Sequence, residues 1–309
     1  MGASKTMNNI FEVVDNTPVF YDTDCVYDVA IVEDCKPSEI ALCTLGAINL
    51  GKIQELSNIE GMAKTLVTSL DNLLDIQDYP VIAAKIATMN RRPLGIGVIN
   101  YAYYLASRGL TYTTSESLLV THNLFESIQY YLLKASMELA KRRGPCPLFG
   151  ETKYAMGILP IDTYKRSVDE LVDPSCLLYD WDELRNDIVK HGLRNSTLTS
   201  LMPSETSSQI SNATNGIEPP RSLVSIKMSK NGGTLSQVLP QYNKLKNKYQ
   251  LLWDDPQLMT GYIKLVAVMQ KFVDQSISAN MSYNPEHYPD GKVPMSVLMK
   301  DLLDCYKYG

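Results

Sequence analysis

Short apolar segments that alternate with amphipathic ones constrain the fold of this chain most strongly. IALCTLGAINL (Ile40–Leu50) is almost entirely apolar and short, which is typical of a strand buried on both faces. The segment after it places Met62, Leu66, Leu70 and Leu73 at helical spacing. A buried strand followed by a helix predicts an α/β fold with parallel strands, in which sites form at the carboxyl ends of the strands.

The same alternation continues through the rest of the chain. We predict further strands over Arg91–Asn100, Asn195–Met202 and, more briefly, Ser222–Lys227. We predict helices over Tyr101–Gly109, Ser115–Lys141, Trp181–Gly192, Thr206–Ala213, Thr260–Ala279 and a last segment from Val293 onward. Residues 1–37 lack this pattern and are interpreted as an irregular lead-in, whereas residues 38–309 are interpreted as one α/β domain without linkers or repeats.

Composition excludes several classes of protein. The 309 residues carry a net charge of -5, which argues against a protein that coats nucleic acid, and we expect no direct nucleic-acid partner. No stretch approaches the roughly 18–20 apolar residues of a membrane span, so we expect a cytoplasmic protein without membrane contact. Six cysteines without a CxxC pair, together with three histidines, predict neither a disulfide scaffold nor a metal site.

The stretch MPSETSSQISNATNGIEPP (Met202–Pro220) is unusually rich in hydroxyls and amides. It follows a predicted strand and begins a predicted helix, whose first backbone amides lack partners and attract anions. Ser204, Thr206 and Ser207 can add hydroxyl donors, and the absence of Lys and Arg indicates recognition by neutral groups. Serine and threonine are also common helix caps, so simple capping is the alternative that this stretch alone favours.

Cys43 lies in the middle of the apolar segment ALCTL. Judged by its neighbours alone, it is a buried thiol of the core rather than a reactive group.

The run from Trp181 to Pro203 resembles the large-subunit signature of ribonucleotide reductases, and PSETSSQISNATNGIEPPR continues the match. The resemblance extends through EIALCTLGAINLGKI, DYPVIAAKIATMNRRPLGIGVINYAYYLA and MQKFVDQSISANMSYNPEHYPDGKVP, and covers about residues 38–309. It is greatest to the class I catalytic subunit of bacteria and their phages. The implied fold is the second half of the ten-stranded α/β barrel of these subunits, incomplete at both ends.

The resemblance implies roles for specific residues. The family's substrate-diphosphate site corresponds to Pro203, Ser204, Glu205, Thr206 and Ser207. Cys43 corresponds to one of two redox-active thiols that reduce the ribose of a ribonucleoside diphosphate and become a disulfide. The implied partners are a small subunit, which contains a metal and generates the radical, and an external thiol reductant of the thioredoxin or glutaredoxin type. No cofactor is expected on this chain itself.

Two parts of the family pattern are unmatched. The family's N-x-C-x-E motif carries the radical cysteine, but here Thr23 and Tyr27 flank Cys25 where Asn and Glu are required. The paired tyrosines of the radical relay and the cysteine-bearing tail are also unmatched, and Tyr306 and Tyr308 precede that point. We therefore expect a chain that is inactive alone and works with a companion chain carrying the first half of the subunit.

Two alternatives to that interpretation stay open. The chain could be a non-catalytic remnant that retains a phosphate-binding loop or a structural role. It could also be an unrelated α/β phosphate-binding enzyme, which requires the long match to be accidental.

Overall fold

A computed structural model of the chain describes residues 11–14, 17–20, 39–228 and 234–309. Its strands are β1 (Phe11–Val14), β2 (Thr17–Phe20), β3 (Thr44–Asn49), β4 (Leu94–Ile99), β5 (Val224–Met228) and β6 (Thr234–Val238). Its α-helices are α2 (Asn58–Ile76), α3 (Ile82–Arg91), α4 (Tyr101–Ser107), α5 (Glu116–Arg143), α6 (Pro160–Thr163), α7 (Trp181–His191), α8 (Glu205–Ile210), α9 (Tyr242–Leu245), α10 (Leu258–Gln270) and α11 (Met295–Tyr308).

Three parallel segments form the centre of the molecule. β3 and β4 pair in parallel, with Thr44 opposite Leu94 and Asn49 opposite Ile99. On the other side of β4, Ile96 forms a parallel bridge with Thr199. The α/β fold with parallel strands is therefore confirmed. Across the residues that the structure describes, the sheet stays open and no barrel closes.

The third parallel segment is shorter than the strand predicted over Asn195–Met202. Only Thr199 forms a bridge, although the amide of Ile96 also donates to the carbonyl of Leu198 at 2.8 Å. On the side facing away from β4, the carboxylate of Asp274 accepts the amides of Leu198 and Thr199, at 2.6 and 2.9 Å. The Asp274 side chain thus binds the amides that a further neighbouring strand would bind. Because a single carboxylate accepts only these two amides, no longer ladder forms on this side of the segment.

The prediction that the Ile40–Leu50 segment is a strand buried on both faces is wrong. The strand itself covers only Thr44–Asn49, and Ile40 and Leu42 before it are 42% and 41% exposed. Leu45 within the strand is 55% exposed. β3 pairs with β4 on one side only among the described residues, so less of its surface is covered than for β4, which is buried throughout.

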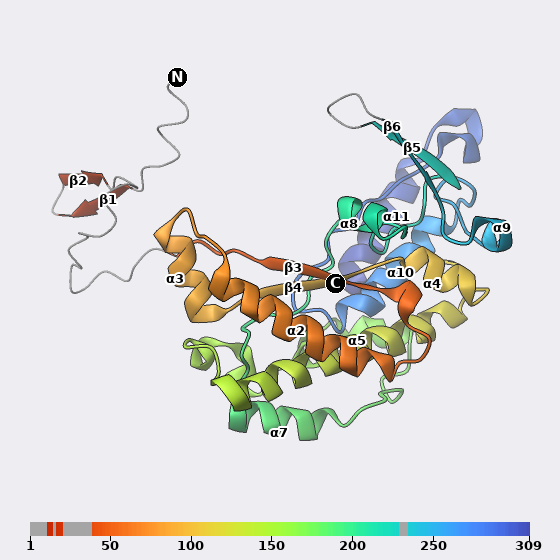
Figure 1. Cartoon of the computed structure of the whole chain (residues 1–309). Coiled ribbons are helices and arrows are strands. Elements are labelled where there is room, and N and C mark those ends of the chain that lie inside the picture. The colour runs from red at the N-terminus through yellow and green to blue at the C-terminus, as the bar shows by residue number, and fades with distance from the viewer. Residues whose placement is uncertain (1–10, 15–16, 21–38, 229–233) are drawn as a thin grey trace.

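Helices cover one face of the β3–β4 pair. Figure 1 shows α2 and α5 side by side beneath these strands, with α7 beyond α5. The buried face of α2 is formed by Ile59, Ala63, Val67, Leu70 and Leu74. This face differs from the predicted apolar face of Met62, Leu66, Leu70 and Leu73, and Leu73 is 44% exposed. The core side chains with almost no exposure include Leu94, Ile96, Leu105, Leu124, Phe125 and Leu132.

A buried ion network ties these helices to the start of β4. Asp71 on α2 is fully buried and its carboxylate accepts from Arg92 at 2.6 Å, Arg143 at 3.2 Å and Arg194 at 3.3 Å. Arg92 ends α3 in the left-handed conformation and also pairs with Asp75. The charge of Asp71 is balanced by several guanidinium groups, which is the condition under which a buried carboxylate is tolerated.

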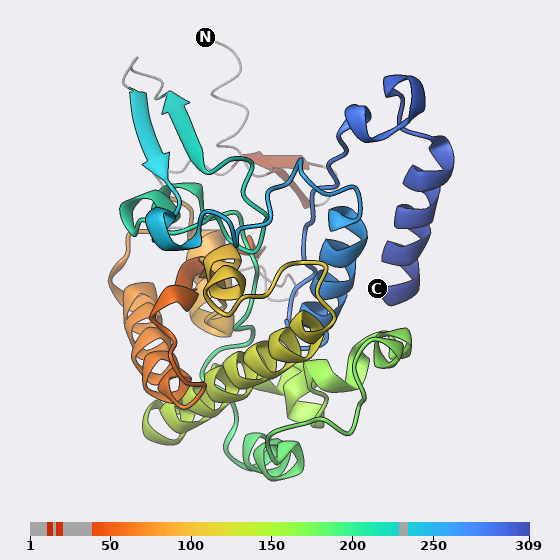
Figure 2. The same cartoon turned by 90° about the vertical axis from the view of Figure 1, so that its right-hand side faces the viewer.

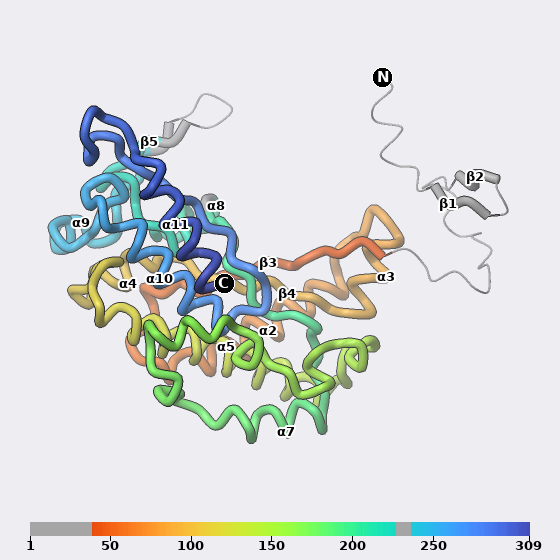
Figure 3. The backbone as a smooth tube through the Cα atoms, turned by 180° about the vertical axis from the view of Figure 1, so that it is seen from behind, coloured from red at the N-terminus to blue at the C-terminus, as the bar shows by residue number. Residues whose placement is uncertain are grey.

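α10 ends at Gln270 rather than at the predicted Ala279. The side chain of Gln270 redirects the chain, because its amide group donates to the carbonyls of Val273 and Gln275 and its oxygen accepts the amide of Ile277 at 2.8 Å. Beside α10 lies α11, as Figure 3 shows from behind. Tyr308 of α11 packs with Val168 in a small second apolar cluster.

The remaining strands form two separate antiparallel pairs. β5 and β6 pair with Val224 opposite Val238 and project from the body of the molecule (Figure 2). β6 was not predicted. In the lead-in, β1 pairs with β2, Phe11 opposite Phe20, so its described residues are not wholly irregular. The domain boundary at residue 38 stays a prediction.

Candidate functional site

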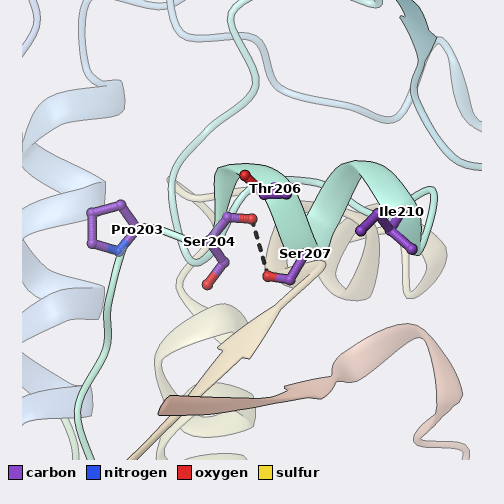
Figure 4. Close-up of a pocket in the computed structure, with 5 residues that line it drawn as sticks. All are labelled: Pro203, Ser204, Thr206, Ser207 and Ile210. Atoms are coloured by element: carbon purple, nitrogen blue, oxygen red, sulfur yellow. Dashed lines mark hydrogen bonds between the residues drawn. The ribbon is translucent and has the colours of Figure 1, made fainter. Parts of the chain in front are cut away.

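The predicted diphosphate-binding residues lie where the third parallel segment leads into α8. Pro203, Ser204, Thr206 and Ser207, together with Ile210, line an open hollow of about 460 Å³ (Figure 4). The side chain of Glu205 lies outside the described part of the structure, although its backbone begins α8. None of the five lining residues is basic, which is consistent with binding by neutral donors. We call Pro203–Ser207 the cradle.

The capping alternative is not supported for Ser204. Ser204 precedes the first residue of α8, but its side chain makes no capping hydrogen bond. Instead its hydroxyl donates to the carbonyl of Met202 at 3.3 Å, and the hydroxyl of Ser207 donates to the carbonyl of Ser204 at 3.3 Å (Figure 4). Thr206 and Ser207 are exposed, so their side chains are accessible from the hollow.

α8 is shorter than the helix predicted over Thr206–Ala213. It ends at Ile210, and Asn212 adopts the left-handed conformation with φ of 46°. The amide of Ala213 then donates to the carbonyl of Ser208 at 2.8 Å, which closes the end of the helix. Asparagine tolerates this conformation better than most residues, so Asn212 is a natural stop.

Asn215 binds the backbone of the cradle, a role that the sequence analysis did not assign to it. Its side-chain oxygen accepts the amide of Ser204 at 2.9 Å. Its amide group donates to Glu218, whose other oxygen accepts from Asn280 at 2.7 Å. The sequence signal for this turn is the dipeptide Asn215–Gly216, a turn-forming pair in which Gly216 has a φ of 44°.

Asn100 binds the same loop at the carboxyl end of β4, and Asn49 in turn binds Asn100 from the end of β3. Asn100, directly after β4, accepts the amide of Thr214 at 3.0 Å. Its amide group donates to the side-chain oxygen of Asn49, the last residue of β3, at 3.0 Å. The cradle loop is therefore anchored where parallel strands end, which is where ligands bind in α/β proteins.

Cys43 lies immediately before β3 and is exposed, so the alternative of a buried core thiol is not supported. Partial burial against neighbouring groups raises the pKa of its thiol, and a hydrogen bond from the Gln275 side chain lowers it to a smaller degree. The thiol is therefore mostly protonated at neutral pH, and its chemistry depends on geometry rather than on an acidified thiolate.

The other sequence-predicted features do not join this site. Thr23, Cys25 and Tyr27 lie outside the described residues. Tyr306 is exposed on α11, whereas Tyr308 is buried on the same helix, so they do not share one surface. No helix in the described part of the chain has the length and apolar character needed to cross a membrane.

Comparison with known proteins gives one consistent family. The model of the ribonucleotide reductase barrel domain matches residues 29–309, a start that precedes the predicted boundary at residue 38. The ribonucleoside-diphosphate reductase subunit alpha of Haemophilus influenzae is 64% identical over 271 residues, which is 88% of this chain and 35% of that protein.

More distant relatives agree. The ribonucleoside-diphosphate reductase 1 subunit alpha of Escherichia coli is 62% identical over 236 residues, covering 76% of this chain and 31% of that protein. The subunit alpha of Enterobacteria phage T4 is 46% identical over 275 residues, covering 88% of this chain and 36% of that protein. The chain thus spans about a third of the length of the curated relatives it matches.

Proposed function

This chain belongs to the ribonucleotide reductase family through its barrel domain, and we propose that it forms part of a catalytic subunit that converts ribonucleoside diphosphates to deoxyribonucleoside diphosphates. The single observation that carries this proposal is the cradle. Four of the residues that correspond to the family's substrate-diphosphate site line one open hollow beside the carboxyl ends of the parallel strands.

The cradle's chemistry fits a diphosphate. The first amides of a helix have no intrahelical acceptor, and they point outward at the end that carries partial positive charge. Thr206 and Ser207 are exposed beside these amides. On binding a diphosphate, the Ser207 hydroxyl would exchange the carbonyl of Ser204 for a phosphate oxygen. Hydrogen bonds to charged oxygens are stronger than those between neutral groups, so such donors can hold a diphosphate without a lysine or arginine.

In this proposal Cys43 is one of two thiols that reduce the ribose. Its thiol and a second one together give up two electrons and two protons, the ribose loses a hydroxyl as water, and the sulfurs become a disulfide. An external dithiol of the thioredoxin or glutaredoxin type restores the thiols for another turnover. The exposure of Cys43 supports this role, because a second cysteine has to come within bonding distance.

We further propose that the rest of the active site comes from a companion chain. The relatives are about three times as long as the matched segment, and the open sheet leaves β3 paired on one side only among the described residues. The companion supplies the second redox thiol and the radical cysteine in this proposal. The radical itself originates in a small subunit that contains a metal.

Reconstitution with the companion and small subunits tests the function. With a ribonucleoside diphosphate and dithiothreitol, we expect deoxyribonucleotide formation by the complex and none by this chain alone. Cys43→Ser keeps the size of the side chain but cannot form a disulfide, so it should abolish turnover while the complex still assembles. Cys176→Ser, at a cysteine of intermediate exposure, is the control and should retain turnover. Wild-type turnover by the Cys43→Ser complex would show that Cys43 is not one of the two redox thiols.

A further inference from the structure

Two glycines interrupt β4 on the face that Cys43 contacts. β4 reads Leu-Gly-Ile-Gly-Val-Ile, and Gly95 and Gly97 are two residues apart, so they lie on the same face of the strand. A Cβ atom built on Gly95 would lie 2.3 Å from Sγ of Cys43. One built on Gly97 would lie 2.7 Å from Sδ of Met202 and 2.7 Å from the carbonyl oxygen of Ser200. The space of both missing side chains is therefore occupied by the two flanking segments.

Backbone conformation does not explain these glycines. Neither Gly95 nor Gly97 has a positive φ, so alanine could adopt the same backbone. Glycine inside a strand costs roughly 0.5–1 kcal/mol relative to alanine, because more conformational freedom is lost on folding. A strand that is otherwise apolar and fully buried has no intrinsic need for this residue. The reason must be the close approach of the neighbours.

We infer that Gly95 is a positioning residue for the Cys43 thiol, because its missing side chain lets Sγ lie directly against the β4 backbone. Gly97 does the same for Ser200 and Met202, the residues that lead into the cradle. The same face of β4 therefore determines how closely the Cys43 thiol and the segment before the cradle approach the strand. The relevance of this close approach to catalysis rests on the proposed function, but the positioning itself can be measured without reductase activity.

A side chain at position 95 has a definite consequence for Cys43. A sulfur and a methyl carbon need well over 3 Å between them, so Sγ has to leave the strand surface and turn toward solvent. Partial burial raises the pKa of the Cys43 thiol more than the hydrogen bond with the Gln275 side chain lowers it. Moving Sγ outward reduces this burial, so the pKa should fall and the thiolate fraction at a given pH should rise.

The test uses the full chain and a neutral alkylating reagent. In Gly95→Ala, we expect iodoacetamide to modify Cys43 about 3- to 10-fold faster near pH 8, with the midpoint of the pH profile shifted down. The rate is followed at each cysteine by peptide mass spectrometry, with Cys305 as the internal reference. Gly61→Ala is the matched control, since a Cβ there meets nothing within 4 Å, and it should leave Cys43 at the wild-type rate.

A compensating substitution covers the case in which Gly95→Ala folds poorly. A Cβ at position 95 would lie 2.3 Å from Sγ of Cys43 and 2.7 Å from Cδ2 of Leu45, and Cys43→Ala removes the closer of the two. Gly95→Ala should therefore lower the melting temperature less in that background than in the wild type. Equal losses in both backgrounds would overturn the inference. So would a folded Gly95→Ala protein whose Cys43 keeps the wild-type rate and pH profile. Either result leaves the reductase test with Cys43→Ser unaffected, so failure of one proposal is distinguishable from failure of the other.

Discussion

Asp274 and Thr199 bind each other in both directions. The amide of Thr199 donates to Oδ2 of Asp274 at 2.9 Å, and the amide of Asp274 donates to the hydroxyl of Thr199 at 2.8 Å. The same carboxylate oxygen accepts the amide of Leu198, while Oδ1 accepts the hydroxyl of Tyr154 and the side-chain amide of Gln129. The loop after α10 therefore holds the parallel segment that leads into the cradle.

Replacing Asp274 should destabilise the whole domain. Asp274→Ala leaves the amides of Leu198 and Thr199 without their acceptor, and each unsatisfied buried group costs about 1–3 kcal/mol. We expect a loss of about 2–5 kcal/mol in the free energy of unfolding, measured by urea denaturation. Asp254→Ala, at an exposed aspartate, should change stability by about 0.5 kcal/mol or less. Equal stability of the two variants would show that the Asp274 contacts contribute little.

Asn215 should matter for nucleotide binding through the cradle backbone. Asn215→Ala removes the acceptor of the Ser204 amide, so the start of α8 is no longer held at its present position. In the assembled complex, we expect affinity for a nucleoside diphosphate to fall by about 1–2 kcal/mol, measured by calorimetry. Ser211→Ala, at an exposed residue directly after α8, is the control. Unchanged affinity in Asn215→Ala would mean that the cradle keeps its shape without this contact.

Alanine substitutions at the cradle hydroxyls distinguish contact with the diphosphate from support of the helix. If they contact the diphosphate, Thr206→Ala and Ser207→Ala should each weaken nucleoside-diphosphate binding by about 1–3 kcal/mol, the range for hydrogen bonds to charged groups. Folding should barely change. If they only support the helix, the melting temperature should fall instead, with or without nucleotide. Wild-type affinity in both variants, with lowered melting temperatures, would contradict a diphosphate site.

His122 should make stability depend on pH. It is fully buried on α5, its Nε2 lies 3.3 Å from Nζ of Lys271, and the carboxylate of Glu126 lies 3.9 Å from its Nδ1. Burial and the charge of Lys271 lower the pKa of His122 to about 4. As pH falls below about 6.5, the unfolded chain therefore takes up this proton before the folded one does.

His122 contributes stability above about pH 6.5 that is lost as the pH falls toward 4, at up to about 1.4 kcal/mol per pH unit. Urea denaturation between these pH values measures the slope. His122→Gln keeps an acceptor for Lys271 but does not titrate, so its free energy of unfolding should fall less steeply with decreasing pH. Parallel pH profiles for the two proteins would contradict a neutral buried histidine.

Local signals in the sequence determined much of the secondary structure. α4, α5 and α7 lie close to their predicted bounds, and Gly192 follows α7 as expected. Helical periodicity, caps and breakers act within a few residues, so a sequence contains them in full. The motif from Trp181 through the cradle likewise identified the family, because its residues are adjacent in the chain.

Only the tertiary structure decided features that depend on distant contacts. The third parallel segment is short because Asp274, far along the chain, takes its amides, and α10 ends early because Gln270 binds the loop after it. The exposure of β3 depends on what packs beside it, which periodicity does not record. Gly95 resembles any strand glycine until the fold places Cys43 against it. Such contacts join residues far apart in sequence, and no local pattern encodes which partners the fold brings together.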